Sequence, residues 1–327
     1  MHGFFLVGPT AVGKSAVAES IAQDLGYDIL SADSMLVYKG MDIGTAKPSK
    51  DSRAHVRYFG IDIESPDKPF SAGEYYRYAC DVLSGAIDRN REVIIAGGTG
   101  LYIKSLTHGL TATPPRIAER RSYWSNVFRE GGLKALQDAL REISPEFLES
   151  LQDKMNHRRL IRALEMAEDG IAKTPDTWKS AGKGTGSSHE AFGVGNRKSG
   201  KIIGLMMPAD MLALRIKDRV EKMFSCGFED EVRNLLKQYG NLSETARQAI
   251  GYAEVIDFIR GKCSLRVAMD KTVIRTRQLA KKQGTWFRHQ ADVEWIHVDP
   301  AMKTEDISRL VLDCWRKYGP TNVIVNR

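Results

Sequence analysis

Short apolar runs alternate with amphipathic stretches over the first hundred residues of the chain. The runs at 4–7, 27–30 and 93–96 are predicted to be buried strands, and the stretch 15–25 is predicted to be a helix. Strands that alternate with helices in this way indicate βαβ units and a parallel sheet. The sequence therefore predicts an α/β fold with a parallel sheet flanked by helices.

The pattern changes near residue 113, where charged, helix-forming sequence replaces the strand-like runs. Helices are predicted at 117–129, 133–143, 145–151 and 158–168. The stretch 182–200 that follows holds six glycines, three serines and one acidic residue, so it is predicted to be a mobile connector. These features indicate an all-helical domain inserted into the α/β core.

Strand-like sequence returns at 201–205, and helices are predicted from there to 290. A further strand is predicted at 293–298 and a terminal helix at 307–318. We therefore predict three parts, namely the first part of a catalytic core at 1–112, the helical insertion at 113–200, and a return to the core at 201–327.

Composition supports a globular protein and leaves its partner open. Hydrophobic residues make up 42% of the 327 residues and charged residues 27%, which is ordinary globular usage. The formal net charge of +7 favours a polyanionic partner, although a solvated surface excess explains it equally well. Charge alone does not decide between these interpretations.

The cysteines and the N-terminal segment indicate a cytoplasmic protein. Cys80, Cys226, Cys263 and Cys314 lie too far apart for a zinc site, so they are predicted to be buried free thiols. No basic leader precedes the first apolar run, and no apolar stretch reaches about 18 residues. We expect no membrane association.

The first strand leads into a glycine-rich motif with the pattern Gly-x4-Gly-Lys-Ser. Its residues are Gly8, Pro9, Thr10, Ala11, Val12, Gly13, Lys14 and Ser15. Between a strand and a helix, such a loop directs backbone N–H groups at phosphate oxygens, which the lysine also reaches, and its serine can bind Mg²⁺. The alternative is a tight strand-to-helix turn without a ligand. The motif predicts an enzyme that handles a diphosphate or polyphosphate.

The predicted strand ends supply one carboxylate near this loop. The strand at 93–96 ends in Gly97-Gly98-Thr99-Gly100 and lacks the acidic residue that holds Mg²⁺ in nucleotide kinases and ATPases. Asp33 follows the strand at 27–30, and ligands of open α/β sheets bind outside the carboxyl ends of the strands. Asp33 is therefore a candidate general base, with the capping of a turn as the alternative.

Several motifs together resemble those of the tRNA dimethylallyltransferases, also called tRNA isopentenyltransferases. Besides the motif at 8–15, they are DSMLVYKGMDIGTAKP at 33–48, GGTGLY at 97–102, RLIRALE at 159–165, GFEDEV at 227–232, AIGY at 249–252 and TRQLAKKQ at 276–283. The resemblance spans nearly the whole chain. The chain departs from the family pattern at Leu36, where many members carry glutamine, and at Tyr58-Phe59, where they carry two histidines.

The resemblance implies a reaction and roles for particular residues. The family transfers a dimethylallyl group from dimethylallyl diphosphate to N6 of adenine 37, beside the anticodon of tRNA, and releases diphosphate. By resemblance, Thr10, Lys14 and Mg²⁺ on Ser15 hold the diphosphate, Asp33 acts as the base, and either Arg215 or Arg219 joins the diphosphate site. We expect the enzyme to work as a monomer.

Residues that contact tRNA are expected from basic patches and from the family motifs. The stretch 271–290 carries six lysines and arginines with no acidic residue, which favours contact with an RNA backbone over a solvated face. Nearby Trp286 and Phe287 are more typical of core residues than of base-stacking platforms. The expected contact residues are Asp33, Ser34, Met35, Leu36, Thr99, Arg158, Arg159, Arg162, Arg247, Gln248, Gly251, Tyr252, Arg277, Lys281, Lys282 and Arg288.

Three other functions remain open from the sequence. An adenylate isopentenyltransferase acts on free AMP, ADP or ATP, and it requires neither the helical insertion nor the basic stretch at 271–290. A P-loop nucleotide kinase or ATPase that binds ATP requires a magnesium carboxylate at a strand end. A noncatalytic RNA-binding protein would not depend on Asp33.

Overall fold

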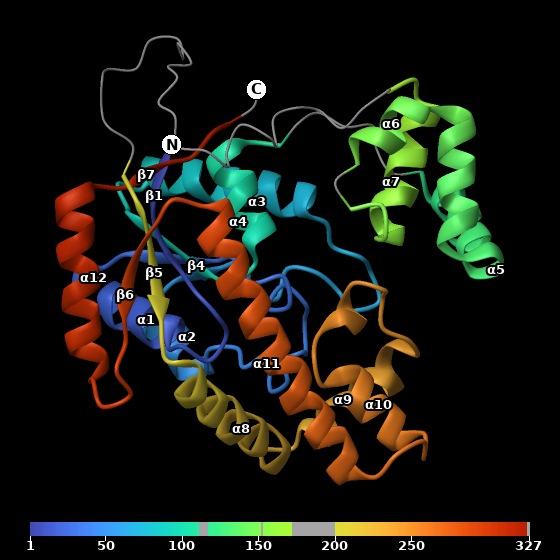
Figure 1. Cartoon of the computed structure of the whole chain (residues 1–327). Coiled ribbons are helices and arrows are strands. Elements are labelled where there is room, and N and C mark those ends of the chain that lie inside the picture. The colour runs from blue at the N-terminus through green and yellow to red at the C-terminus, as the bar shows by residue number, and fades with distance from the viewer. Residues whose placement is uncertain (111–116, 152, 172–199, 326–327) are drawn as a thin grey trace, which may run out of the picture. The chain divides into compact units, whose positions relative to one another are not determined.

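The computed structural model describes residues 1–110, 117–151, 153–171 and 200–325 (Figure 1). The chain forms two compact units, one made of Met1–Leu110 with Gly184–Arg327 and the other of Thr111–Lys183. The predicted limits of the insertion, 113 and 200, fall within or directly beside undescribed ranges, so they remain predictions. The predicted connector at 182–200 lies, except for Gly200, outside the described residues.

A twisted sheet forms the centre of the first unit. Its strands are β1 (His2–Val7), β2 (Asp28–Ser31), β3 (Tyr58–Phe59), β4 (Val93–Gly97), β5 (Ile202–Met206), β6 (Val293–His297) and β7 (Thr321–Asn322). The order β3-β2-β4-β1-β5-β6 is parallel throughout, and β7 pairs antiparallel with β1. The predicted parallel α/β fold is confirmed, and the first unit brings residues from both ends of the chain into one sheet.

Helices occupy most of the remaining described chain. In the first unit they are α1 (Lys14–Leu25), α2 (Lys50–His55), α3 (Ala72–Asp88), α4 (Gly100–His108), α8 (Ala209–Ser225), α9 (Phe228–Tyr239), α10 (Tyr252–Ile259), α11 (Leu265–Gln290) and α12 (Thr304–Tyr318), with a short 3₁₀ helix at Ala246–Gln248. In the second unit they are α5 (Ala118–Ile143), α6 (Pro145–Ser150) and α7 (His157–Glu168). Among the described residues, no helix combines the length and the apolar character that a membrane span needs.

Two apolar cores lie on the two faces of the sheet. On one face Ile21 of α1 and Val311 of α12 pack with Leu6 of β1. On the other, Tyr75 of α3 and Ile103 of α4 pack with the alternate side chains of the same strands (Figure 1). Strands covered on both faces are apolar throughout, which is why the sequence shows them as continuous hydrophobic runs.

A third core supports the long segment that follows β2. Val37 and Tyr38 of this segment pack with Phe228 of α9 and Tyr252 of α10. Figure 1 shows α9 and α10 grouped at the far end of the long helix α11. The helices beyond β5 therefore hold a segment that the sheet alone does not cover.

The second unit is a helical unit with its own core, in which Leu136, Leu140 and Leu160 are fully buried. Gly132 has a φ of 66°, which interrupts α5 with non-helical backbone. The two helices predicted at 117–129 and 133–143 are therefore present, joined at this break.

The sequence missed or misjudged several local features. It did not predict β3 or β7, each of which has two residues. Helix α11 begins at Leu265, where the side chain of Ser264 accepts a hydrogen bond from the Val267 N–H, so the basic stretch 271–290 starts inside this helix. The prediction of buried thiols is wrong for Cys226, which is exposed at the end of α8, whereas the other three cysteines are partly buried.

Candidate active site

The segment 8–15, which we call the 8–15 loop, joins β1 to α1. Gly8 has a φ of 144°, and a Cβ placed there would lie 2.4 Å from the carbonyl oxygen of Leu205 on β5, so only glycine fits. Gly13 adopts a left-handed conformation as it caps α1. The loop therefore lies at the carboxyl end of β1 and against β5, and its last two residues, Lys14 and Ser15, are the first residues of α1.

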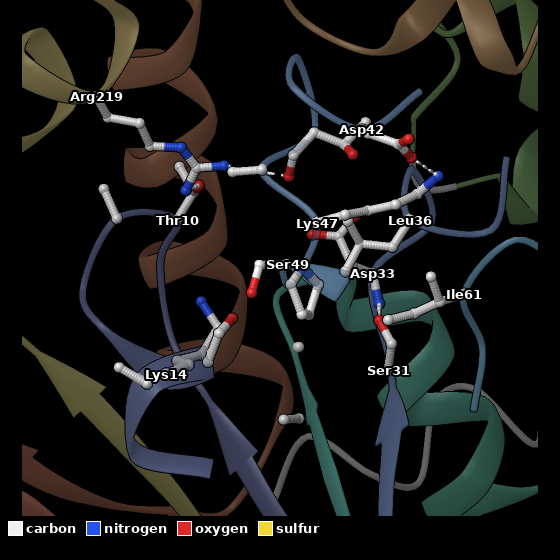
Figure 2. A pocket seen from close by; sticks show the side chains of 18 of the residues that line it. Thr10, Lys14, Ser31, Asp33, Leu36, Asp42, Lys47, Ser49, Ile61 and Arg219 are labelled. Carbon is white, nitrogen blue, oxygen red and sulfur yellow. Dashed lines mark hydrogen bonds and ion pairs between the residues drawn. The ribbon is translucent and has the colours of Figure 1, made fainter. Parts of the chain in front are cut away.

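A cavity of about 800 Å³ opens at the carboxyl ends of the strands, where the 8–15 loop forms part of its wall. Figure 2 shows the cationic side chains of Lys14 and Arg219 along one side of this cavity and the carboxylate of Asp33 on the other. Ser15 and Leu36 also line it. The fold thus gathers the predicted loop, base and arginine into one cavity.

Lys14 is held in a site that disfavours its charged form. Its Nζ donates a hydrogen bond of 2.7 Å to the carbonyl oxygen of Pro9. Burial lowers the pKa of Lys14 to about 8, while Asp33 raises it and Arg219 lowers it further. The cavity therefore holds two neighbouring cations that a bound polyanion would stabilise.

The structure distinguishes between the two candidate arginines, both of which lie on α8. Arg219 is partly buried, and its Nη1 lies 3.3 Å from Oγ1 of Thr10, while its Nη2 donates to the carbonyl oxygen of Thr45 at 3.3 Å. Burial lowers the pKa of Arg219, and Asp33 acts in the opposite direction. Arg215 is exposed, and its Nη1 lies 3.4 Å from the carbonyl oxygen of Val12. Arg219 is therefore the arginine that faces both Lys14 and Asp33.

Asp33 follows β2 and uses one carboxylate oxygen to hold a turn. Its Oδ1 accepts a hydrogen bond of 2.9 Å from the backbone N–H of Met35, and its own N–H donates to Oγ of Ser31 at 3.3 Å. Within the described residues, Oδ2 has no hydrogen-bond partner. The capping function and a role as base are therefore compatible, because one oxygen fixes the carboxylate and the other is free to take a proton.

The second glycine turn, at 97–100, meets the Asp33 turn. Oγ1 of Thr99 accepts a hydrogen bond of 3.0 Å from the N–H of Ser34 and lies 3.3 Å from its hydroxyl. A Cβ on Gly97 would lie 2.2 Å from the carbonyl oxygen of Ala32, so the two strand ends approach closely. Thr99 therefore positions the segment that carries Asp33.

Gln283 of α11 connects the two glycine-rich turns. Its Oε1 accepts a hydrogen bond of 2.8 Å from the N–H of Thr10, and its Nε2 donates to the carbonyl oxygen of Gly98 at 3.0 Å. Three residues further on, Trp286 packs so closely on the second turn that a Cβ on Gly100 would lie 2.4 Å from its ring. One face of α11 therefore holds both turns in place.

The segment after Asp33 is fixed by charged side chains. A carboxylate oxygen of Glu231 on α9 accepts the N–H groups of Asp42 and Ile43 at 2.8 and 2.6 Å. The side chain of Lys47, which is 1% exposed, pairs with Asp42 and with Asp62 at 2.7 and 2.6 Å. These contacts explain the family motifs at 33–48 and 227–232, because they position the backbone that meets Arg219.

The predicted RNA-contact residues of the first unit separate into exposed and buried groups. Arg277, Lys281, Lys282 and Arg288 are exposed on α11, and Arg247 and Gln248 are exposed in the 3₁₀ helix. Gly251 and Tyr252 are buried, and the hydroxyl of Tyr252 donates to Glu231 at 2.6 Å. Burial excludes direct contact of Gly251 and Tyr252 with RNA in this structure, so their prediction as contact residues is corrected to that of supporting residues.

The predicted residues near Asp33 and in the second unit have different surroundings. Leu36 lines the cavity, whereas Met35 packs against the third core. In the second unit Arg158 and Arg159 are exposed on α7, but Arg162 is partly buried and pairs with Glu165 at 3.0 Å. Phe287 is fully buried, and Trp286 is half-buried on the glycine turn, as expected of packing residues.

Sequence reasoning missed several residues of the cavity wall. Arg53, Tyr58 and Asp218 line it, as do Thr45 and Gln283. Tyr58, one of the departures from the family pattern, donates its hydroxyl to Glu19 at 2.5 Å, and burial and Glu19 raise its pKa. Thr45 and Gln283 lie within matched motifs, but nothing in the sequence shows that they meet Arg219 and Thr10.

The fold and the cavity define an α/β enzyme whose site lies at the carboxyl ends of a parallel sheet. The family model described as IPP transferase matches residues 36–290. The chain is 36% identical over 294 residues to the tRNA dimethylallyltransferase of Halothermothrix orenii, covering 90% of this chain and 86% of that protein. The chain belongs to the tRNA dimethylallyltransferase family.

Solved structures agree with this assignment. The tRNA isopentenylpyrophosphate transferase of Bacillus halodurans has a TM-score of 0.65 and 32% identity, with 95% of this chain and 96% of that chain covered. The corresponding enzyme of Staphylococcus epidermidis has a TM-score of 0.65 and 31% identity, with 96% and 99% covered. The resemblance inferred from the motifs is confirmed.

Proposed function

We propose that this protein transfers a dimethylallyl group from dimethylallyl diphosphate to N6 of adenine 37 in tRNA. Its family supports the reaction, and the arrangement of Lys14, Arg219 and Asp33 around one cavity carries the assignment of roles. In the reaction, the bond between the allylic carbon and the diphosphate oxygen breaks and the bond from that carbon to N6 forms. The N6 proton passes to Asp33, and diphosphate leaves.

The cations of the cavity stabilise the leaving diphosphate. Negative charge develops on it as the allylic bond breaks, and preorganised donors stabilise such charge more strongly in a partly buried site than in water. Lys14 and Arg219 supply the charge, and free backbone N–H groups of the 8–15 loop and Thr10 Oγ1 add donors. The N–H of Thr10 itself is engaged by Gln283, so it serves to fix the loop.

Asp33 accepts the proton from the attacking amine. The exocyclic amine of adenine is a weak nucleophile because its lone pair is delocalised into the ring, so a nearby carboxylate assists the attack. The target base has to leave its stack to reach the cavity, and the exposed cations of α11 suit the displaced RNA strand. We further propose that the enzyme binds the anticodon stem-loop of tRNA. It would work as a monomer and act in the cytoplasm.

Mg²⁺ fits this site only together with the diphosphate. The hydroxyl of Ser15 lines the cavity, and among the described residues no group of three or more histidines, cysteines and acids could hold a metal. Mg²⁺ commonly takes few protein ligands and completes its shell with phosphate oxygens and water. Bound there, the ion would neutralise charge on the diphosphate. We therefore propose Ser15 as its protein ligand.

A direct test uses labelled dimethylallyl diphosphate with either tRNA or AMP as acceptor. We expect label in tRNA and none in AMP. Label that enters only AMP would assign the protein to the free-nucleotide isopentenyltransferases, and steady phosphate release from ATP without label transfer would assign it to the kinases or ATPases.

A further inference from the structure

A second cavity, of about 700 Å³, lies beside the candidate active site and is lined by cations. Its charged and titratable lining side chains are Arg53, His55, Arg57, Arg89 and Arg91, together with the phenol of Tyr58, and no acidic residue lines it. Arg53 and Tyr58 also line the active-site cavity, so the two cavities adjoin. The arginines reach it from α2, from the position just before β3 and from the turn between α3 and β4.

The carboxylates next to these arginines do not balance their charge. The fully buried Asp28 is shared by two of them, with Arg91 Nη2 at 3.3 Å and Arg89 Nη2 at 3.5 Å. Asp62 is likewise shared, because it pairs with both Arg53 and Lys47 at 2.6 Å. Arg57 is exposed and has no ion pair within the described residues. The lining therefore carries an excess of positive charge.

The guanidinium groups of Arg89 and Arg91 are also held in place before any ligand arrives. Arg91 donates to Asp28 through both Nε and Nη2, at 3.4 and 3.3 Å. Arg89 lies over the ring of Phe59, with 5.7 Å between its Cζ and the ring centroid. Fixed guanidinium forks lose little conformational freedom when they bind and match the geometry of phosphate oxygens.

From this excess charge and its position we infer that the second cavity is a binding site for a diphosphate group. The choice of ligand rests on the proposed function, in which diphosphate is released in the adjoining cavity. The same chemistry would be offered by inorganic diphosphate or by the diphosphate of a free nucleotide. A site here would receive the product on its way out of the active site.

Titration calorimetry of the full chain with inorganic diphosphate tests this inference. We expect two bound diphosphates per wild-type chain and one per chain of Lys14→Met, which removes only the site at the 8–15 loop. Arg57→Gln should weaken the remaining site at least about tenfold, since a charge-assisted hydrogen bond is lost. Arg57 has no ion pair to lose, so this variant should fold normally. The matched control is Arg77→Gln, an exposed arginine of α3, and it should bind as wild type does.

Each other outcome has a defined meaning. Three results would overturn the inference. They are a single diphosphate site in the wild-type chain, complete loss of diphosphate binding in Lys14→Met, and diphosphate binding that is unchanged in Arg57→Gln. If an anticodon stem-loop RNA displaced the second diphosphate and also bound Arg57→Gln more weakly than wild type, these two results together would overturn the inference in favour of an RNA-backbone site. Titration with ADP distinguishes a nucleotide from free diphosphate, and binding of either one at this site supports the inference.

Prenyl transfer is measured on the same preparations. Two diphosphate sites without transfer to tRNA would reject the proposed function and leave the site standing. Prenyl transfer by a chain with a single diphosphate site would support the proposed function and reject the second site.

Discussion

The cations of the active-site cavity and the cations of α11 occupy different surroundings. Lys14 and Arg219 are partly buried near one carboxylate, and burial lowers the pKa of each. Arg277, Lys281 and Lys282 are exposed on a helix face. A buried cation costs folding free energy and binds an anion in a fixed geometry, whereas an exposed cation costs little and attracts phosphates in a way that salt screens. We therefore propose that the cations in the cavity serve the reaction and that those on the helix serve RNA affinity.

Asp33 should show the largest single effect, because it is the lining carboxylate that acts on both Lys14 and Arg219, whereas Asp42 pairs with Lys47. Asp33→Asn should lower the rate of prenyl transfer by about 10² to 10⁴. The asparagine keeps an oxygen for the Met35 N–H, so binding of tRNA and of diphosphate should change little. Single-turnover rates and filter binding measure the two separately, and near-normal transfer would remove Asp33 from the mechanism.

The two arginines of α8 sharpen the comparison within one helix. Arg219→Ala should lower kcat by about 10² to 10³, the usual loss of one preorganised donor. Arg215→Ala is the matched control, because its side chain also lines the cavity but is exposed and contacts the loop only at the carbonyl oxygen of Val12. We expect a much smaller loss for Arg215, and equal losses would contradict the distinction drawn here.

Lys14 should make both stability and donor binding depend on pH. Its folded pKa of about 8 lies below the value of about 10.4 for an unfolded lysine, so the unfolded chain binds more protons between these values. The contribution of Lys14 to the free energy of unfolding therefore rises with pH across that window and is constant below it. Affinity for diphosphate should fall as pH rises through about 8, because the ammonium loses its charge.

Lys14→Met removes the group that titrates. Without ligand, this variant should melt at a higher temperature than wild type at pH 7, while its diphosphate binding at the 8–15 loop is lost. Melting curves from pH 7 to 10 provide the check. A lower melting temperature at pH 7 would show that the hydrogen bond to Pro9 outweighs the cost of burying the charge.

Variants of Gln283 test whether α11 positions the cavity wall independently of any contact with RNA. Gln283→Leu removes the hydrogen bonds to Thr10 and Gly98, so the 8–15 loop should lose its fixed position and kcat/KM for the donor should fall about tenfold, as expected from the loss of roughly 1.4 kcal/mol. In Gln283→Glu, kcat/KM for the donor should fall by the same amount, because a carboxylate cannot donate a hydrogen bond to the Gly98 carbonyl. Gln278→Leu is the matched control, on the exposed face of the same helix. If kcat/KM for the donor were unchanged in Gln283→Leu, the two hydrogen bonds of Gln283 would not be needed to position the loop.

The exposed cations should show the smallest effect per residue. Lys281→Ser should weaken tRNA binding modestly and lower the slope of log affinity against log salt by about 0.7 to 0.9, with no change in donor affinity. Binding measured from 50 to 300 mM salt gives this slope. An unchanged slope would place Lys281 outside the RNA contact.

The sequence predicted features that depend on local pattern. The strands β1, β2 and β4 were visible because burial on both faces makes them apolar throughout, and the 8–15 loop was visible because its glycines and lysine are adjacent in the chain. The edge strand β3 was not visible in the sequence, because two residues are too few to show a periodic pattern. Its pairing depends on β2, which lies far from it in sequence.

The relations between motifs were not visible in the sequence. Thr10 and Gln283 meet although 273 positions separate them, and the sheet order brings them together. Tyr252 was expected to contact RNA because it lies in a family motif, yet it is buried under Glu231. A motif marks a residue that matters to the family, but it does not show whether that residue touches the substrate or supports another that does.

We propose that the diphosphate held by the 8–15 loop leaves only as the prenyl group reaches an adenine of RNA. The most direct measurement follows diphosphate release and label transfer together, with an anticodon stem-loop that carries either adenine or guanine at the target position. We expect one diphosphate to be released for each prenyl group attached to the adenine RNA, and neither product with the guanine RNA. Diphosphate release that proceeds equally with the guanine RNA would contradict it.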